Sequence, residues 1–292
     1  MVSIRPSALI PLFSFLAAAL PAAEAITARQ VVERIQKQSG VTWRTPTVDT
    51  FKAGDPDTPV KGIACVMMST FDVIKRAAAG GANFIITHEP TYYSGQDNTT
   101  MLESENDPVY AAKLAFIKEH GLVIWRFHDH QHAMKPDPVV TGTANVLGWQ
   151  KFQVDPATPR FVIPATTVAD LAEQVRQKFG VRTLRFVGDP KLKVTKVGFA
   201  PGASGFNLQR RLLQSADVEA LLIGECTEWE AVEYVADAAA QGKPKALILI
   251  GHIASEEAGM VETSKWLKGF VPEVPVQFVA TPEFFTLPAG AK

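Results

Sequence analysis

Phe84-Ile85-Ile86-Thr87-His88-Glu89-Pro90 is the stretch that decides the fold of this 292-residue chain. Its apolar, partly β-branched first half predicts a buried strand that runs directly into His-Glu, and the proline then favours an extended exit. An apolar run at Gly62–Met67 predicts the preceding strand, and Thr70–Ala79 predicts a helix that ends at Gly80-Gly81. Strand, helix and strand in this order are typical of a parallel βαβ unit.

The same alternation continues toward residue 150. Asp107-Pro108 begins a helix, with the aspartate as its cap and the proline at its first position. The spacing predicts that Val109, Ala112 and Phe116 form the buried face of this helix. Leu122–Phe127 predicts the next strand.

Past Trp149 the pattern repeats. Further strands are predicted at Arg160–Ile163, Thr183–Val187, Val194–Ala200, Leu221–Ile223 and Ala246–Ile250. Helices are predicted at Val168–Phe179, after Gly205, through Ala231–Ala240 and after Ser255, which could cap the last one. No Pro/Ser-rich linker separates residues 26–150 from residues 151–292. We therefore predict an α/β fold of two related, packed halves with mixed sheets.

The first 25 residues differ from the rest. Arg5 precedes the uncharged apolar run Ala8–Leu20, and Ala23-Glu24-Ala25 places small residues at both specificity positions of a signal-peptidase site. This pattern predicts a cleavable signal peptide at residues 1–25 and a periplasmic or secreted protein. The apolar run is short for a bilayer span, so we expect no stable membrane insertion.

The composition is that of an ordinary globular protein. The chain has 29 basic and 30 acidic residues, a net charge of −1, and therefore no basic footprint that would predict nucleic-acid binding. Cys65 lies in an apolar run that predicts a buried thiol, so we expect it to be unpaired with Cys226, although export would permit a disulfide.

Three clusters of candidate ligands follow predicted strands, where the loops of an open α/β sheet converge. In the first, His88-Glu89 could place two ligands beside neighbouring ions, or could be a capping histidine and a solvated glutamate. In the second, His128, His130 and His132 would form one comb if the segment is extended, because alternate residues face one way. Imidazoles in such a group suit Zn, Fe, Ni or Cu, whereas the alternative is an exposed polar loop.

The third cluster is His252 and Glu256, four residues apart at the predicted start of a helix. Positions i and i+4 share a helix face, so imidazole and carboxylate could bind the same ion. Two weaker features are the loop Gly202–Gly205, which could bind an anion through backbone N–H groups or be a simple turn, and Glu225 after a strand. Glu225 could be a general base, an orienting residue or a surface glutamate.

Several of these motifs together resemble the Nif3-like (NGG1p-interacting factor 3-like) family, in order over roughly residues 26–280. They are Ala53–Val60, Ile85–Pro90, His128–His132 before Gly142–Gly148, Gly224-Glu225, and Gly251-His252-Ile253-Ala254-Ser255-Glu256. The resemblance implies two related α/β domains, a dinuclear metal centre in the cleft between them, and a homo-oligomer in the form of a toroidal hexamer. It also implies that His88, His252 and Glu256 bind metal, and some members carry a GTP cyclohydrolase label.

The chain departs from that family pattern at two ligand positions. Glu89 stands where the family has a second consecutive histidine, and His132 stands where the family has an aspartate ligand. We interpret these as one exchange and predict His88, Glu89, His132, His252 and Glu256 as metal ligands, three histidines and two carboxylates as in the family. His130 or Asp129 could instead take the position of His132, and whether His128 binds metal is left open.

The function expected from the sequence is a metal-dependent hydrolase outside the cytoplasm, acting on a phosphoester, amide or similar small molecule. Two divalent ions (Zn, Fe or Mn) would activate a water molecule, with Glu225 or Asp129 as proton acceptor or orienting residue. The alternatives are a metal-binding or scaffold protein without turnover, and a GTP-cyclohydrolase-like enzyme. An accessible cleft at the site would favour the hydrolase, and a closed coordination shell would favour the scaffold.

Overall fold

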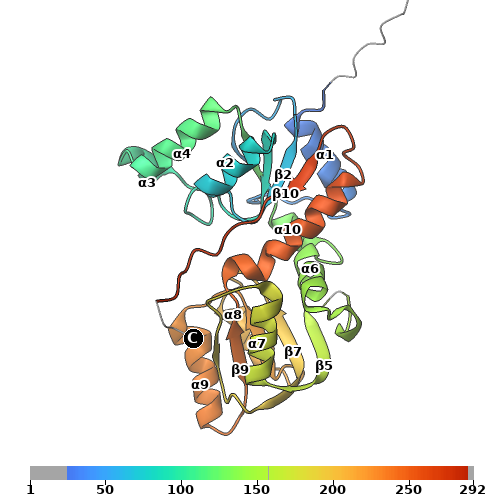
Figure 1. The fold of residues 1–292 in the computed structure, drawn as a ribbon, viewed down its shortest axis with the longest axis vertical. Coiled ribbons are helices and arrows are strands. Elements are labelled where there is room, and N and C mark those ends of the chain that lie inside the picture. The colour runs from blue at the N-terminus through green and yellow to red at the C-terminus, as the bar shows by residue number, and fades with distance from the viewer. Residues whose placement is uncertain (1–24, 157, 289–292) are drawn as a thin grey trace, which may run out of the picture.

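The computed structural model describes residues 25–156 and 158–288, which form two lobes, each built on a five-stranded sheet (Figure 1). In the first sheet the strand order is β1-β4-β3-β2-β10, and only β1 runs antiparallel to its neighbour. The strands are β1 (Phe51–Ala53), β2 (Ile63–Val66), β3 (Phe84–Thr87), β4 (Val123–Arg126) and β10 (Val276–Phe278). The helices from this part of the chain are α1 (Ala28–Gln38), α2 (Phe71–Ala79), α3 (Thr100–Ser104), α4 (Pro108–Glu119), α5 (Asp129–Ala133) and α6 (Pro138–Leu147).

The second sheet has the order β5-β7-β8-β9-β6, with parallel central strands and an antiparallel strand at each edge. Its strands are β5 (Arg160–Thr167), β6 (Arg185–Val187), β7 (Lys193–Ala200), β8 (Ala220–Ile223) and β9 (Ala246–Leu249). A short 3₁₀ helix (Gln150–Phe152), α7 (Val168–Phe179), α8 (Phe206–Gln214), a π-helical turn (Glu228–Val232), α9 (Glu233–Ala240) and α10 (His252–Lys268) complete the fold. The predicted α/β fold with two related halves and mixed sheets is confirmed.

Helix α10 joins the two lobes. It starts after β9 of the second sheet, packs against α6 at the junction, and leads to β10, which pairs with β2 of the first sheet (Figure 1). A Cβ atom on Gly142 of α6 would lie 2.5 Å from the backbone of Ala258, so glycine permits this close approach. The predicted half of residues 151–292 therefore supplies a strand to the first sheet as well, because α10 carries the chain back.

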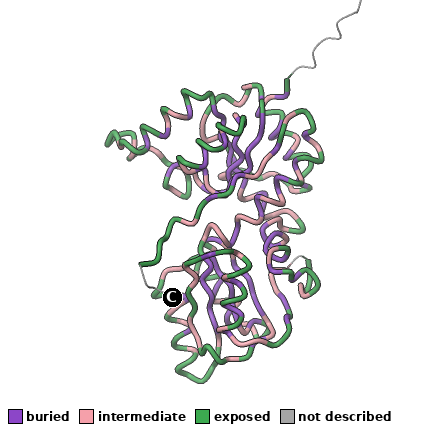
Figure 2. The backbone as a smooth tube through the Cα atoms, viewed as in Figure 1, coloured by how far each residue is buried: buried purple, intermediate pink, exposed green. Residues whose placement is uncertain are grey.

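Buried residues are concentrated on the two sheets and at the junction between them (Figure 2). Strands β2, β3 and β4 are buried along their whole length, as their continuous apolar sequences predict for parallel strands covered on both faces. Their register pairs Val66 with Thr87 and Thr87 with Arg126. The residues that follow these strands therefore emerge side by side at one edge of the first sheet.

Two predictions about helices were wrong in detail. Helix α4 buries Tyr110, Lys113 and Ile117, whereas the predicted Val109 is 61% exposed. The ammonium of Lys113 donates to a buried backbone carbonyl. Because the buried face of the helix contains this lysine, the apolar residues in the sequence did not indicate which face is buried. Helix α10 begins at His252, with Gly251 as its cap, so Ser255 lies inside the helix and does not cap it.

Both cysteines are free thiols, with Cys65 buried and Cys226 partly exposed. The predicted signal peptide lies almost wholly outside the described residues, which begin at residue 25. Within the described ranges, no helix is both long and apolar enough to cross a membrane.

Candidate metal centre

Six side chains from three separate segments meet between the lobes, and we call them the His/Glu cluster. They are His88 and Glu89 after β3, His128 and His132 of the α5 segment, and His252 and Glu256 of α10. Ligand atoms of His88, His128 and His132 lie within 4.8 Å of one another, and so do those of His88, Glu89 and Glu256. The structure thus brings together all five residues that were predicted as metal ligands and adds His128.

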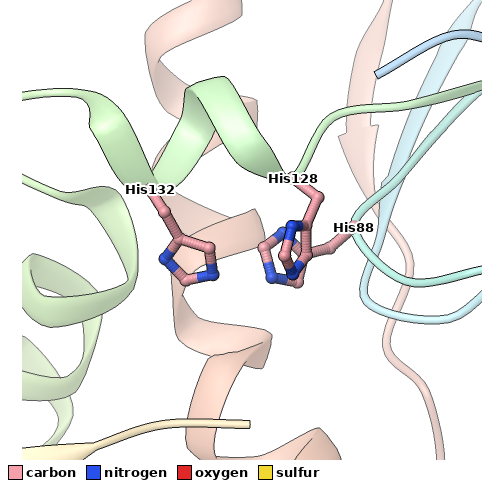
Figure 3. Close-up of side chains that lie close together, drawn as sticks. All are labelled: His88, His128 and His132. Carbon is pink, nitrogen blue, oxygen red and sulfur yellow. The ribbon is translucent and has the colours of Figure 1, made fainter. Parts of the chain in front are cut away.

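The segment that carries two of these histidines is helical, so the predicted extended comb of three histidines was wrong. In α5, His128 and His132 are four residues apart and face the same side, where their rings lie with that of His88 (Figure 3). His130 faces away: its Nδ1 donates to Asp49 at 2.7 Å, and its Nε2 accepts from the backbone N–H of Arg44. His130 is therefore a structural residue in this protein.

Asp49 is the reason for the helical turn. This buried carboxylate accepts the backbone N–H groups of His128, Asp129 and His130 at 2.7–3.0 Å, in addition to the ring of His130. Three successive N–H groups directed at one anion fix the start of a helix. Sequence reasoning missed Asp49 because it lies about 80 residues before its partners.

We predict that Asp49→Ala lowers the free energy of unfolding by about 3 kcal/mol, since it leaves several buried donors without an acceptor. It should also lower metal content by displacing His128 and His132. Chemical denaturation of both forms measures the first effect. The exposed Asp72, which pairs with Arg76 within one helix, provides the matched control, and Asp72→Ala should change stability by less than about 1 kcal/mol. Equal losses in the two variants would contradict the role given to Asp49.

Each imidazole of the cluster is held from outside through its Nδ1 atom. His88 Nδ1 lies 2.5 Å from the side-chain oxygen of Gln131, and His128 Nδ1 lies 3.1 Å from Asp129 Oδ1. Asp129 is itself held by the hydroxyl of Thr47 at 2.9 Å. An N–H group at Nδ1 leaves the lone pair of Nε2 free, which is how metal-binding histidines are usually oriented. Asp129 therefore occupies the orienting position that was one of its two predicted roles.

The other two histidines follow the same arrangement. His132 Nδ1 donates to Asp137 Oδ2 at 3.0 Å, and the other oxygen of Asp137 caps α6. His252 Nδ1 lies 3.5 Å from Glu225 Oε1, and Glu225 is 57% exposed. Glu225 thus contacts the cluster from its solvent side. No sequence pattern pointed to Gln131 or Asp137, apart from the general frequency of such partners around metal-binding histidines.

Glu256 is at the middle of the cluster and is buried. One carboxylate oxygen lies 3.6 Å from His132 Nε2, and the other lies 3.5 Å from His88 Nε2 and 3.1 Å from His252 Nε2. The loop Gly202–Gly205 packs against it: a Cβ atom on Gly202 would lie 2.4 Å from the carboxylate, and the N–H of Gly202 donates to Ser255. This contact explains the glycine, and that N–H is not available to an anion.

The buried carboxylates of the cluster need positive charge nearby to remain ionised. Burial would raise the pKa of Glu256, but the surrounding histidines hold it well below its usual value. Burial likewise opposes the charging of His252, yet its contacts with Glu225, Glu256 and Glu89 raise its pKa to about 12. Burial and the charges of His88 and His132, in contrast, lower the pKa of His128 to about 4. The carboxylates are therefore ionised and favour protonation of some of the imidazoles. A bound metal ion would replace those protons.

The His/Glu cluster also contains buried polar atoms that lack a hydrogen-bond partner, as expected for metal ligands. Among the described residues, His88 Nε2 and Glu256 Oε2 are buried side-chain atoms without a hydrogen-bond partner. Buried polar atoms are rarely left unpaired in proteins, because each costs about 1–3 kcal/mol. An imidazole nitrogen and a carboxylate oxygen that face each other at 3.5 Å are ligands that Zn, Fe or Mn accept. The cluster is a candidate site for such ions.

Comparison with solved structures supports the fold. A Bacillus cereus protein related to NIF3 superposes with a TM-score of 0.71 at 13% identity, over 91% of this chain and 100% of that one. A Staphylococcus aureus hypothetical protein superposes with a TM-score of 0.70 at 17% identity and the same coverage. At these identities the likeness concerns the fold alone.

Comparison of sequences gives the family. A protein from Clostridium acetobutylicum named GTP cyclohydrolase 1 type 2 homolog is 24% identical over 227 residues, which are 74% of this chain and 80% of that protein. The sequence profile of the Duf34/NIF3 (NGG1p interacting factor 3) family matches residues 47–283. This match contains every residue of the His/Glu cluster. The chain therefore belongs to the Duf34/NIF3 family.

Proposed function

We propose that this protein binds two divalent metal ions in the His/Glu cluster and hydrolyses a small substrate there. We assign the six side chains to two ligand groups, one for each ion, and Glu89 lies near both groups because its Oε1 is also 3.7 Å from His128 Nε2. The imidazoles of His88, His128 and His132 form one group of nitrogen donors. His252 Nε2 and Glu89 Oε1, 3.1 Å apart, form the other. Glu256 contacts both groups through its two oxygens and would be shared.

The observation that carries a catalytic role is the access to this site. His252 and Glu225 line a cleft of about 1280 Å³ whose other walls come from both lobes and from the segment after β10. Bound ions at such a position lower the pKa of a water molecule and polarise a phosphoryl or carbonyl oxygen. An open cleft beside the ligands favours turnover over a closed, purely structural site.

Within this cleft, Glu225 has the position of a proton acceptor. Its carboxylate is more than half exposed, and the positive charge of His252 lowers its pKa, so it is ionised and open to the cleft at neutral pH. Asp129 lacks this access because His128 and Thr47 occupy its two oxygens. We therefore assign the proton-accepting role to Glu225 and an orienting role to Asp129.

The test combines metal analysis with a substrate panel. We expect about two divalent ions per chain, and hydrolysis of at least one member of a panel of phosphoesters, amides and lactones. Removal of the ions by a chelator should lower that rate at least about a hundredfold, and added metal should restore it. GTP belongs in the panel because of the name carried by the clostridial relative. Two bound ions without turnover of any substrate would favour the metal-binding scaffold, and no bound ions would refute the proposal.

We further propose that the protein acts outside the cytoplasm. The support is the pattern at residues 1–25, a basic start, an apolar run and Ala-Glu-Ala. Nucleotides are scarce outside cells, and export would therefore make GTP a less suitable substrate than an extracellular ester or amide.

A further inference from the structure

The buried side chain of Arg126, at the end of β4, reaches into the loop that carries His88 and Glu89. Its Nε donates to the backbone carbonyl of His88 at 3.0 Å, and one terminal nitrogen donates to the carbonyl of Gly95 at 2.7 Å. The other terminal nitrogen donates to Glu89 Oε2 at 3.2 Å. One guanidinium thus fixes both the backbone and a carboxylate of this loop.

Arg126 is itself held from the side opposite the cluster. Asp97 Oδ2 lies 3.6 Å from the guanidinium and 3.2 Å from the ammonium of Lys52, and all three side chains are at most 7% exposed. Asp97 also accepts the backbone N–H groups of Thr91 and Tyr92. Lys52, Asp97, Arg126 and Glu89 therefore form a buried row of alternating charges that ends at the His/Glu cluster.

The consequence for Glu89 is that its two oxygens differ. Oε2 is engaged by Arg126, whereas Oε1 faces the cluster, 3.1 Å from His252 Nε2 and 3.7 Å from His128 Nε2. A glutamate side chain without such a partner is free to rotate, and ordering it on binding costs free energy. The guanidinium removes that freedom before a metal ion arrives.

We propose that Arg126 is a positioning residue that presents Glu89 to the second metal ion through one oxygen and so sets the affinity for that ion. This inference rests on the proposed two-metal centre. The fork of the guanidinium makes three directed contacts at once, which a lysine ammonium on a flexible stem cannot reproduce. Geometry, and not charge alone, is therefore the contribution of Arg126, and Arg126→Lys separates the two.

The experiment measures the dissociation constants of both ions by competition with a chromogenic chelator, using Zn²⁺ and Mn²⁺ as probes. In Arg126→Lys, binding of the second ion should weaken at least about tenfold, as is usual when a residue that supports a metal ligand is lost. Binding of the first ion should weaken clearly less than that of the second, because Arg126 touches only the backbone carbonyl of His88 and none of the three imidazoles. Circular dichroism and thermal unfolding establish that the variant is folded.

The matched background is Glu89→His, which keeps a ligand at position 89 but removes the carboxylate that Arg126 holds. There, Arg126→Lys should change second-ion affinity less than about threefold, because coupled neighbours are not additive. An equal loss in both backgrounds, or an equal loss of both ions, would show a purely structural role and overturn the inference. Wild-type affinity for the second ion in Arg126→Lys would also overturn it. If wild-type protein binds no metal, the two-metal proposal itself fails, which is a distinguishable outcome.

Discussion

Glu256→Gln is expected to lower the metal content from about two ions per chain to nearly none. The carboxylate of Glu256 contacts an imidazole of each ligand group, at 3.1–3.6 Å, so its loss affects both ions. The substitution is nearly isosteric and removes one negative charge from a buried site in which two cations lie close together. A loss of affinity of at least about a thousandfold for the weaker ion is expected from such a change in ligand charge.

Elemental analysis after gel filtration measures this effect, and two controls flank it. Glu257→Gln alters the neighbouring residue of the same helix. The carboxylate of Glu257 accepts a hydrogen bond from the backbone N–H of Thr281 and is not part of the His/Glu cluster. His120→Ala removes an exposed imidazole whose Nδ1 bonds to the carbonyl of Phe116. Both should retain wild-type metal content, whereas His252→Ala should lose at least one ion. Full metal content in Glu256→Gln would refute the assignment of the cluster.

The hydrophobic pattern of the sequence was sufficient to place most of these ligands. His88, Glu89 and His252 directly follow strands that are buried on both faces, and such strands are recognisable as continuous apolar runs. Strands β3 and β9 belong to different sheets, so the common edge of parallel strands did not predict that His88 and His252 meet, and only the family resemblance implied a site between the two halves. The i and i+4 spacing of His252 and Glu256 predicted their shared helix face.

The remaining features depend on contacts between distant residues. Asp49 turns the segment after β4 into a helix, and this long-range contact decides which of three histidines face the site. Strand β10 returns to the first sheet only because α10 spans the junction. In the sequence, Arg126 is only a polar residue near the end of a predicted strand. The contact between its guanidinium and Glu89 is visible only in the folded structure. A periodic pattern contains no information of this kind, since it reports which face a residue takes and not its partner.

The exchange of ligand types at positions 89 and 132 predicts a specific result in a double-mutant cycle. Relative to the family pattern, the chain has a carboxylate in place of an imidazole at Glu89 and an imidazole in place of a carboxylate at His132. Glu89→His alone lowers the negative charge of the cluster by one. His132→Asp alone raises it by one and puts a third carboxylate beside Asp137 and Glu256. Glu89→His should therefore weaken binding of the second ion by about tenfold or more, and His132→Asp should weaken binding of the first ion because it removes one of that ion's three imidazoles.

The double variant restores the summed ligand charge of the wild type. We expect it to bind its two ions more tightly than the sum of the two single losses in binding free energy predicts, with a coupling free energy of at least about 1 kcal/mol. Glu256 provides the physical link, because its carboxylate lies near His132 and shares the other ligand group with Glu89. Recovery should remain incomplete, since the buried Arg126 then loses one of its two carboxylate partners and keeps only Asp97. Chelator competition on the four proteins measures the cycle, and strictly additive losses would show that positions 89 and 132 do not share one metal centre.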